Sequence, residues 1–316
     1  MALIFFCLAW LARQGRIVLV AGLIVGIGLP PLAATLQAYI PEVVAVMLFL
    51  AAFRIGPSAV IGRLSGLKTT VLIVVLFQVG LPCLLALGFR LCGFSGPLAN
   101  AVVLAAAASP ISGSPNLTLM AGHDPAPSLR LLIVGTALLP LTVLPAFFFW
   151  PLFGAPSAVV FSSLRLLVII GAAAGLAFAL RHFWKPVLSE RDVIAVDGLS
   201  AFAMAFAVIG LMAAFGTTMR EAPMQLMAPL AAAFLFNFGL QIAAYIFQMK
   251  SGIGSTAAAA HAISAGNRNN MLFLAALPAS IMAPLYLFIA CYQIPMYLTP
   301  LLLGRFYRGP AGQSSS

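Results

Sequence analysis

Two short polar stretches have the residue types to do chemistry in a chain that is otherwise almost wholly apolar. The first covers residues 109–116 and reads SPISGSPN, and the second covers 264–270 and reads SAGNRNN. Proline, glycine and asparagine in such runs break helices, and a broken helix at membrane depth must line a cavity or lie inside protein. Matched breaks in two halves of a chain are typical of the substrate site of a secondary transporter.

Arg268 stands in the second stretch, inside an apolar segment. An arginine at mid-membrane costs about 2.5–3.5 kcal/mol on insertion scales, so its retention needs a reason. In one interpretation it is a fixed cation that binds an anionic substrate or replaces a coupling cation, because a planar guanidinium suits carboxylate or phosphate. In the other it is a structural arginine that caps the carbonyls of the broken helix. We take the first as the working hypothesis, and the second stays open.

Neutral polar side chains accompany this cation, and their amides and hydroxyls both donate and accept hydrogen bonds. Half-helices are expected to begin at Asn116 and near Asn270. Their positive dipole ends would point at the place where the two broken segments meet, which favours an anion there. The same side chains could instead satisfy backbone groups freed by the breaks. The predicted substrate-binding residues are Ser112, Ser114, Asn116, Asn267, Arg268 and Asn269.

Other residues that could do chemistry are few. Gln78, Asn237 and Gln241 lie within apolar segments, where they either bond neighbouring helices or line a cavity. Of the six acidic residues only Asp197 could reach into the membrane, and Arg54 is expected to be buried against a neighbouring span. Intramembrane carboxylates usually carry coupled protons or bind sodium strongly. The sequence shows no nucleotide loop, metal cluster or nucleophile–base set, so we expect neither an enzyme nor a bound cofactor.

The composition indicates an integral membrane protein. The 316 residues are 63% hydrophobic and 7% charged, whereas a soluble domain carries about 25% charged residues. The net charge of +10 could suggest nucleic acid, but the basic residues lie at the ends of apolar segments and form no patch. The expected partners are therefore the lipid bilayer and a small organic anion.

Apolar stretches of about 20 residues recur along the chain and predict an all-α fold of ten spans. Five spans in each half require that the two repeats, about 16–151 and 157–308, be inverted relative to each other. The two polar stretches then make the fourth and ninth helices broken and crossing. We expect one membrane domain, 1–308, and a disordered tail, 309–316. The predicted spans are 16–36, 41–61, 68–89, 97–122, 126–150, 157–180, 192–214, 224–248, 255–277 and 280–303.

Lysine and arginine are distributed unevenly between the two ends of these spans. Only Arg90 and Arg220 lie at the ends that would face outward if the N-terminus were inside. The positive-inside rule therefore places both termini in the cytoplasm, and we expect a cell inner membrane. The inner ends hold Arg13, Arg16, Arg63, Lys68, Arg181, Lys185, Arg191, Lys250, Arg305 and Arg308.

Taken in order, the motifs resemble the bile acid:sodium symporter superfamily over about residues 15–308. The resemblance implies ten helices arranged as a panel domain and a core domain, with crossed broken helices and sodium-coupled transport of organic anions. The stretches that carry it are Met47–Leu50, Gly66–Lys68, Phe77–Pro82, Pro110–Met120, Asp197-Gly198, Asn237, Ala262–Asn269 and Leu301–Phe306.

The chain departs from this family at the sodium ligands. Ser264 stands where the family has an acid, Arg268 replaces a glutamine, and Pro115 replaces a small hydroxyl residue. A guanidinium would repel a second cation by roughly 4 kcal/mol at about 4 Å and an effective dielectric of 20. The resemblance in fold is unaffected, but the family's set of sodium ligands is largely missing. By resemblance the ion-site positions are Gln78, Asn116, Ser264, Asn267 and Arg268.

The leading functional hypothesis is a secondary transporter that moves a small organic anion by alternating access, without coupling to sodium. One alternative is a conventional sodium-coupled symporter of organic anions or bile acids. Relatives that export arsenite or auxin-like acids share the expected fold and give another. A further alternative, from a different class, is a membrane sensor or scaffold that retains the fold and does not transport.

Overall fold

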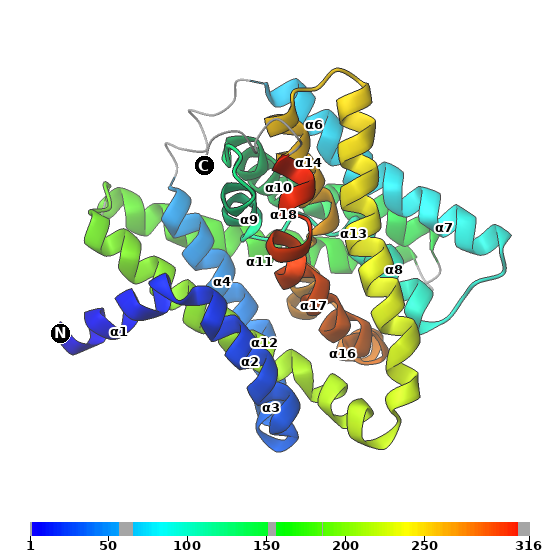
Figure 1. The fold of residues 1–316 in the computed structure, drawn as a ribbon, viewed down its shortest axis with the longest axis horizontal. Coiled ribbons are helices and arrows are strands. Elements are labelled where there is room, and N and C mark those ends of the chain that lie inside the picture. Colours follow the sequence, from blue (N-terminus) through cyan, green and yellow to red (C-terminus); the bar gives the residue numbers. More distant parts are fainter. Residues whose placement is uncertain (1, 57–65, 151–155, 185, 309–316) are drawn as a thin grey trace. The chain divides into compact units, whose positions relative to one another are not determined.

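The computed structural model describes residues 2–56, 66–150, 156–184 and 186–308, and within these ranges the chain is helical apart from short loops (Figure 1). The all-α prediction is confirmed for these ranges. Arg63, Lys185 and the predicted tail 309–316 lie outside them. Among the described residues, six helices are long and apolar enough to cross a membrane, and the number of spans rises to as many as eight if each of two bent helix pairs counts as one. This supports a multi-pass membrane protein, while ten spans in two inverted repeats stay a prediction.

The chain forms two compact units, and each unit draws on both halves of the sequence. The first unit comprises Met1–Ser65, Leu164–Leu226 and Met271–Ala290. The second comprises Gly66–Ser163, Met227–Asn270 and Cys291–Ser316. The division therefore does not follow the predicted boundary between the two repeats.

The first unit is assembled around the long helix α12 (Glu190–Glu221), which packs on α1, α2, α3 and α4. Ser189 and Asp192 form a capping box that begins α12. Close approach of α2 depends on Gly26, where a Cβ would fall 2.6 Å from the Met212 side chain. The other helices of this unit are α1 (Ala2–Arg13), α2 (Gly15–Gly28), α3 (Pro30–Gln37), α4 (Ile40–Ile55), most of α11 (Pro156–Phe183), α15 (Met271–Ala276) and α16 (Ala279–Met282).

The first predicted span, 16–36, is wrong as one continuous helix. It divides at Leu29 into α2 and α3, and the backbone of Leu29 leaves the helical region with φ −123° and ψ 70°. Pro30 explains this, because a residue that precedes proline is pushed out of the α conformation, while proline itself favours the first turn of a new helix. The next helix, α4, is bent by 67° from α3.

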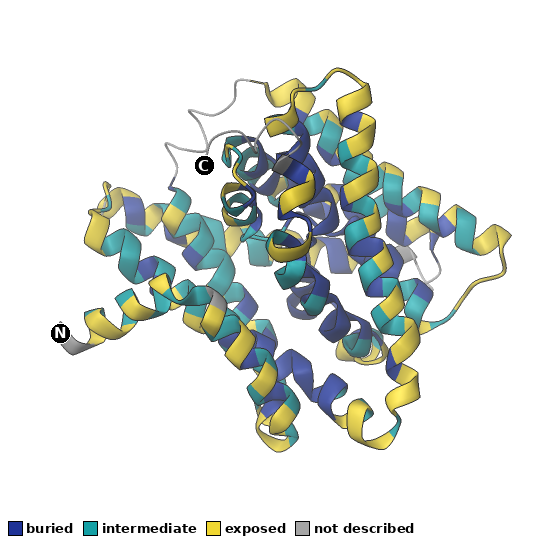
Figure 2. Cartoon of the chain, viewed as in Figure 1, coloured by how far each residue is buried: buried dark blue, intermediate teal, exposed yellow. Residues whose placement is uncertain are grey.

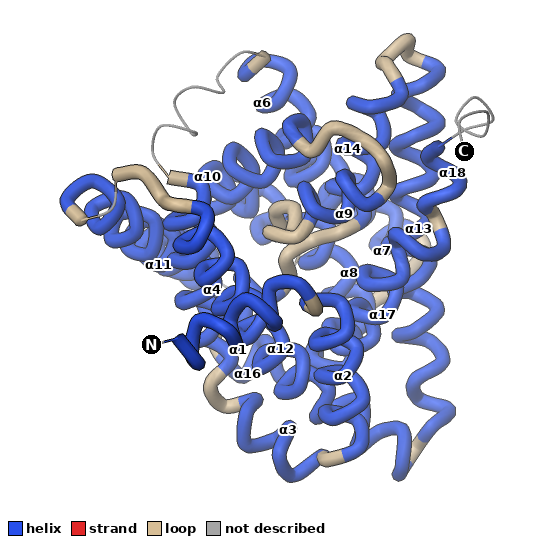
Figure 3. Tube along the Cα trace, turned by 60° about the vertical axis from the view of Figure 1, so that its left-hand side comes forward, coloured by secondary structure: helices blue, strands red, loops and turns tan. Residues whose placement is uncertain are grey.

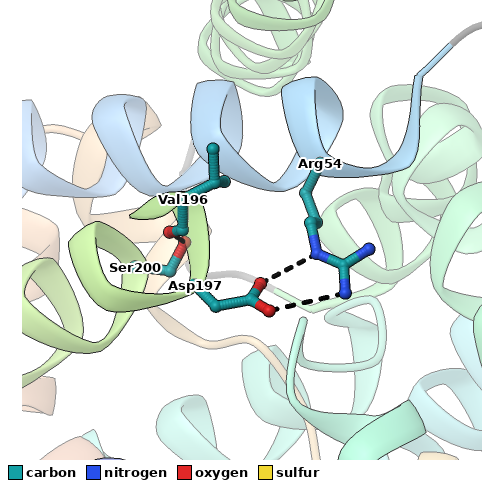
Figure 4. A network of polar contacts seen from close by, with 4 residues as sticks. All are labelled: Arg54, Val196, Asp197 and Ser200. Carbon is teal, nitrogen blue, oxygen red and sulfur yellow. Dashed lines mark hydrogen bonds and ion pairs between the residues drawn. The ribbon is translucent and has the colours of Figure 1, made fainter. Parts of the chain in front are cut away.

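Arg54 of α4 and Asp197 of α12 form an ion pair in the first unit (Figure 4). Arg54 Nε lies 2.8 Å from Asp197 Oδ1, and Nη2 lies 3.4 Å from Oδ2. The expectation of a buried Arg54 is wrong, since its side chain is 46% exposed and that of Asp197 is 43% exposed. Asp197 was the one acidic residue expected to be able to reach the membrane interior. Its carboxylate is paired with Arg54.

The second unit contains both predicted helix breaks. A continuous helix runs from Leu67 to Leu91 and includes one π-helical turn, η1 (Leu76–Gly80). Buried residues concentrate on the alanine-rich helices α8 and α14, whose small side chains allow close approach (Figure 2). The remaining helices are α6 (Leu67–Val75), α7 (Leu81–Leu91), α8 (Pro97–Ala107), α9 (Ser114–Met120), α10 (Ala126–Phe149), α13 (Met227–Lys250), α14 (Ser255–Gly266), most of α17 (Tyr286–Leu302) and α18 (Gly304–Arg308).

A buried hydroxyl pair ties three of these helices together. Ser128 of α10 donates a hydrogen bond to the Ala260 carbonyl of α14 (3.0 Å), and its oxygen lies 2.6 Å from Thr118 Oγ of α9. Each of these side chains is wholly buried. The bonds fix α9 and α14, the helices on either side of the breaks, against the same face of α10.

Candidate functional site

The two broken segments meet inside the second unit, where Figure 3 draws the link between α8 and α9 as loop. Pro110 and Arg268 form an isolated antiparallel bridge. The Ile111 N–H donates to the Asn267 carbonyl (3.0 Å), and the Asn269 N–H donates to the Ser109 carbonyl (2.8 Å). Each break thus supplies hydrogen-bond partners for the other, which an irregular backbone at membrane depth requires. We call this meeting point the crossing.

The guanidinium of Arg268 is buried at the crossing and binds backbone carbonyls. Its Nε donates to Ala265 O (2.7 Å), Nη1 to Ala108 O (3.0 Å) and Nη2 to Phe77 O (3.2 Å). The group also lies over the Phe77 ring, 5.3 Å from its centroid. The side chain is 1% exposed. These contacts are those of the structural interpretation, in which the arginine caps freed carbonyls.

Local sequence explains why these three carbonyls are available. In the π turn the Leu81 N–H bonds Leu76 O, and the next residue, Pro82, has no N–H to offer to Phe77 O. Ala265 O loses its usual helical partner because the Asn269 N–H is donated across the crossing to Ser109. Ala108 is the C-terminal cap of α8. Arg268 therefore completes the backbone hydrogen bonding of three separate helices.

The C-terminal ends of two helices also determine the electrostatic potential at the crossing. Ala108 and Ala265 lie at the C-terminal ends of α8 and α14, and each helix end carries roughly half a negative charge. Together they supply about one charge, which matches the guanidinium without a carboxylate. The expected helix starts are displaced: α9 begins at Ser114 and α15 at Met271, rather than at Asn116 and Asn270.

A chain of buried amides and hydroxyls holds the second break from the other side. Asn237 Nδ2 donates to Gly266 O (2.6 Å) and to Asn267 Oδ1 (3.2 Å). Gln241 Nε2 donates to Asn237 Oδ1 (2.6 Å) and to Thr299 Oγ (3.0 Å). Asn237 and Gln241 therefore bond neighbouring segments, which was the first of the two roles that the sequence left open for them.

Two tyrosines extend this network. The Tyr292 hydroxyl accepts a hydrogen bond from the Arg268 backbone N–H (3.3 Å) and donates to Gly266 O. Tyr307 of α18 donates to Gln241 Oε1 (2.9 Å). Burial raises the pKa of the Tyr307 phenol, and Tyr245 beside it adds to this shift, so the phenol stays a proton donor. The C-terminal helix is thus hydrogen-bonded to the crossing through two side chains.

Some polar atoms beside the crossing are buried and have no hydrogen-bond partner among the described residues. They are Gln78 Nε2, Ser114 Oγ and both polar side-chain atoms of Asn270. Gln78 uses its other amide atom to accept from Thr142 (2.7 Å). Its nitrogen lies next to the crossing, since a Cβ built on Gly135 would fall 2.6 Å from it and 3.1 Å from Pro110. Buried polar atoms without partners are costly, so these are candidate contacts for a bound ligand.

The structure separates the predicted site residues into two groups. Asn267 and Arg268 bind the protein itself, and Ser264 donates to Ala260 O (2.8 Å). Ser112 and Asn269 are half-buried and Asn116 is exposed, so these three are accessible. Sequence reasoning did not select Tyr292, Thr142, Thr299 or Asn270 for the site. The first three carry no local signal, while the polar run 264–270 did contain Asn270.

No protein-family model matches this chain, and no curated protein matches it. The resemblance to the bile acid:sodium symporter superfamily therefore stays a prediction.

Gly266 gives a first test of the packing at the crossing. A Cβ there would overlap the Asn237 carbonyl oxygen and the Gln241 side chain. Gly266→Ala should lower the free energy of unfolding by about 1–3 kcal/mol, the usual cost of overpacking. The control is Gly254→Ala, because no atom lies within 4 Å of a Cβ at Gly254. Equal melting temperatures for the two variants in detergent would show that the segments are not in close contact.

Proposed function

We propose that this protein is a secondary transporter that moves a small organic anion across the membrane by alternating access. The observation that carries the proposal is the meeting of two helix breaks, through backbone hydrogen bonds at Pro110 and Arg268, in an otherwise helical and apolar chain. Broken helices at matched positions of two halves are where secondary transporters bind substrate.

The division into two units supports a mechanism of this kind. Each unit contains segments from both halves of the sequence, as inverted repeats that exchange helices would produce. The six long helices, the two bent pairs and the two broken segments would together supply the ten spans of the proposed architecture. Alternating access would expose the crossing first to one side of the membrane and then to the other.

The polar groups at the crossing favour an anion as substrate. The guanidinium gives a buried positive charge, and no ion pair with a carboxylate is recorded for it among the described residues. We infer that it contributes a positive potential while neutral donors contact the substrate. The accessible donors are on Ser112, Asn116 and Asn269. The buried donors that lack a partner among the described residues are Gln78 Nε2, Ser114 Oγ and Asn270 Nδ2.

The same groups argue against sodium coupling. The Ser264 hydroxyl donates to Ala260 O, and Asn267 is bonded on both of its amide atoms. Strong sodium sites usually include a carboxylate, whereas a positive charge already fills this place. We therefore propose that anion transport does not depend on sodium.

Ligand binding tests this function. Purified protein should bind at least one of acetate, pyruvate, succinate and taurocholate, with the same dissociation constant in sodium chloride and in choline chloride. Asn269→Ala should weaken that binding by roughly 2- to 12-fold, the effect of one neutral hydrogen bond of about 0.5–1.5 kcal/mol. Calorimetry measures both results.

The control for this experiment is Gln225→Ala, since Gln225 is exposed in the first unit. It should bind the acid as tightly as the parent does. The proposal fails if none of the four acids binds, or if Asn269→Ala and Gln225→Ala bind equally tightly.

A further inference from the structure

We propose that Ala108, Ala265 and Phe77 form a monovalent-cation site from their carbonyl oxygens, and that the protein fills this site with its own guanidinium. The crossing then carries a tethered cation and has no need of a dissolved one. The inference rests on the proposed function only where it concerns coupling of transport to sodium. The cation site itself stabilises the fold whether or not the protein transports anything.

The geometry is that of three acceptors arranged around the N–H groups of one planar cation. Three carbonyl oxygens from three helices lie 2.7, 3.0 and 3.2 Å from three different nitrogens of one guanidinium. Carbonyl oxygens of this kind replace the hydration shell of alkali cations in ion-selective proteins. Two of the oxygens belong to helix C-terminal ends, whose partial charges together favour a single positive charge.

The three carbonyl oxygens are free to bind a cation because they lack their usual backbone N–H donors. Pro82 offers no N–H to Phe77 O, and the Asn269 N–H is used by Ser109. Without Arg268 the three oxygens would be buried acceptors without a donor, each at a cost comparable to a lost hydrogen bond. Such a set of oxygens favours a cation that carries several N–H donors.

Tethering explains why a dissolved ion should not compete. A group linked to its site by a short chain acts at an effective concentration in the millimolar range or above, and it cannot diffuse away. Arg268 is also held by its backbone, through the Tyr292 hydroxyl and the bridge to Pro110. A cation that never leaves cannot couple transport to its own gradient, so the crossing should be insensitive to sodium.

Chemical rescue tests the cation site. Arg268→Ala, purified in detergent, should melt below the parent, and guanidinium chloride at low millimolar concentration should raise its melting temperature by several degrees. Sodium or potassium chloride should give a smaller rise, and choline chloride should give none. The parent should respond to none of these salts. Arg165→Ala is the matched control, since Arg165 is an exposed arginine on α11, and guanidinium should not stabilise it.

The proposal is overturned if no small cation stabilises Arg268→Ala more than choline does, or if guanidinium stabilises Arg165→Ala equally. If Arg268→Ala does not fold, the melting temperatures of Arg268→Lys and Arg268→Gln are compared instead. A cation site predicts that the lysine variant melts above the glutamine variant, and that sodium raises the melting temperature of the glutamine variant alone. The reverse order of melting overturns the proposal. These readouts need no substrate, so failure of anion binding leaves them unchanged.

Discussion

Replacing Arg268 with methionine is expected to lower the free energy of unfolding by roughly 3–9 kcal/mol. The substitution keeps an unbranched side chain of similar length but leaves the carbonyls of Ala265, Ala108 and Phe77 buried without a donor. Each unsatisfied acceptor costs about 1–3 kcal/mol, and the three belong to separate helices, so relaxation of one end relieves only one of them. Equilibrium unfolding in mixed micelles measures the loss.

The matched control is Arg165→Met, which removes an arginine from α11 where the side chain is exposed. Surface substitutions usually stay within about 0.5 kcal/mol of the parent. If Arg268→Met is as stable as this control, the three carbonyls have other donors and the arginine does not hold the crossing together.

The second large effect is expected at Asn237. Asn237→Leu conserves shape but removes the bonds to Gly266 O and Asn267 and the acceptor for Gln241. Three hydrogen bonds of about 0.5–1.5 kcal/mol each predict a loss of roughly 1.5–4.5 kcal/mol. The loss should be smaller than for Arg268→Met, because Tyr292 still donates to Gly266 O and Thr299 still lies beside Asn267.

A double-mutant cycle shows whether the polar chain acts as a unit. Asn237→Leu and Gln241→Leu share the 2.6 Å bond between their amides, so the double variant should lose less than the sum of the single losses. The difference should be roughly 0.5–3 kcal/mol, as found for residues in one network. Additive losses would mean that the two amides are independent supports.

The fold was predictable where punctuation in the sequence is strong. Pro110 and Gly113 end one helix and begin another, and the break at 267–270 follows the alanine-rich run of α14. The location of the polar stretches within apolar segments was enough to place the two helix breaks there. The composition alone was enough to predict membrane helices. These signals are local, because each depends on residues that are neighbours in the sequence.

The partners of Arg268 were not predictable, because they are long-range. Phe77 lies 191 residues away in sequence, and its carbonyl is free only because a π turn meets Pro82. The dipole expectation was incomplete for a similar reason: it counted the starts of the half-helices after each break and left out the ends before them. Tyr292 gave no signal, since a tyrosine in an apolar helix is unremarkable until its hydroxyl finds Arg268.

The interruption at Leu29 between α2 and α3 shows a different limit. Hydropathy alone made residues 16–36 one span, and Pro30-Pro31 was read as a boundary mark near its end. The structure begins a new helix at Pro30 and so shortens α2 to Gly15–Gly28. Proline had the stronger influence because its effect on the preceding residue is steric, whereas hydropathy does not specify where a helix ends.

Uptake by the purified protein in liposomes decides whether it transports an organic anion without sodium. The vesicles are given labelled acetate, pyruvate, succinate or taurocholate under an inward gradient of sodium chloride or of choline chloride, with protein-free vesicles as the blank. A crossing held by its own guanidinium predicts uptake of at least one acid at the same initial rate in both salts. Uptake that requires the sodium gradient, or the absence of uptake of all four acids, would contradict the account.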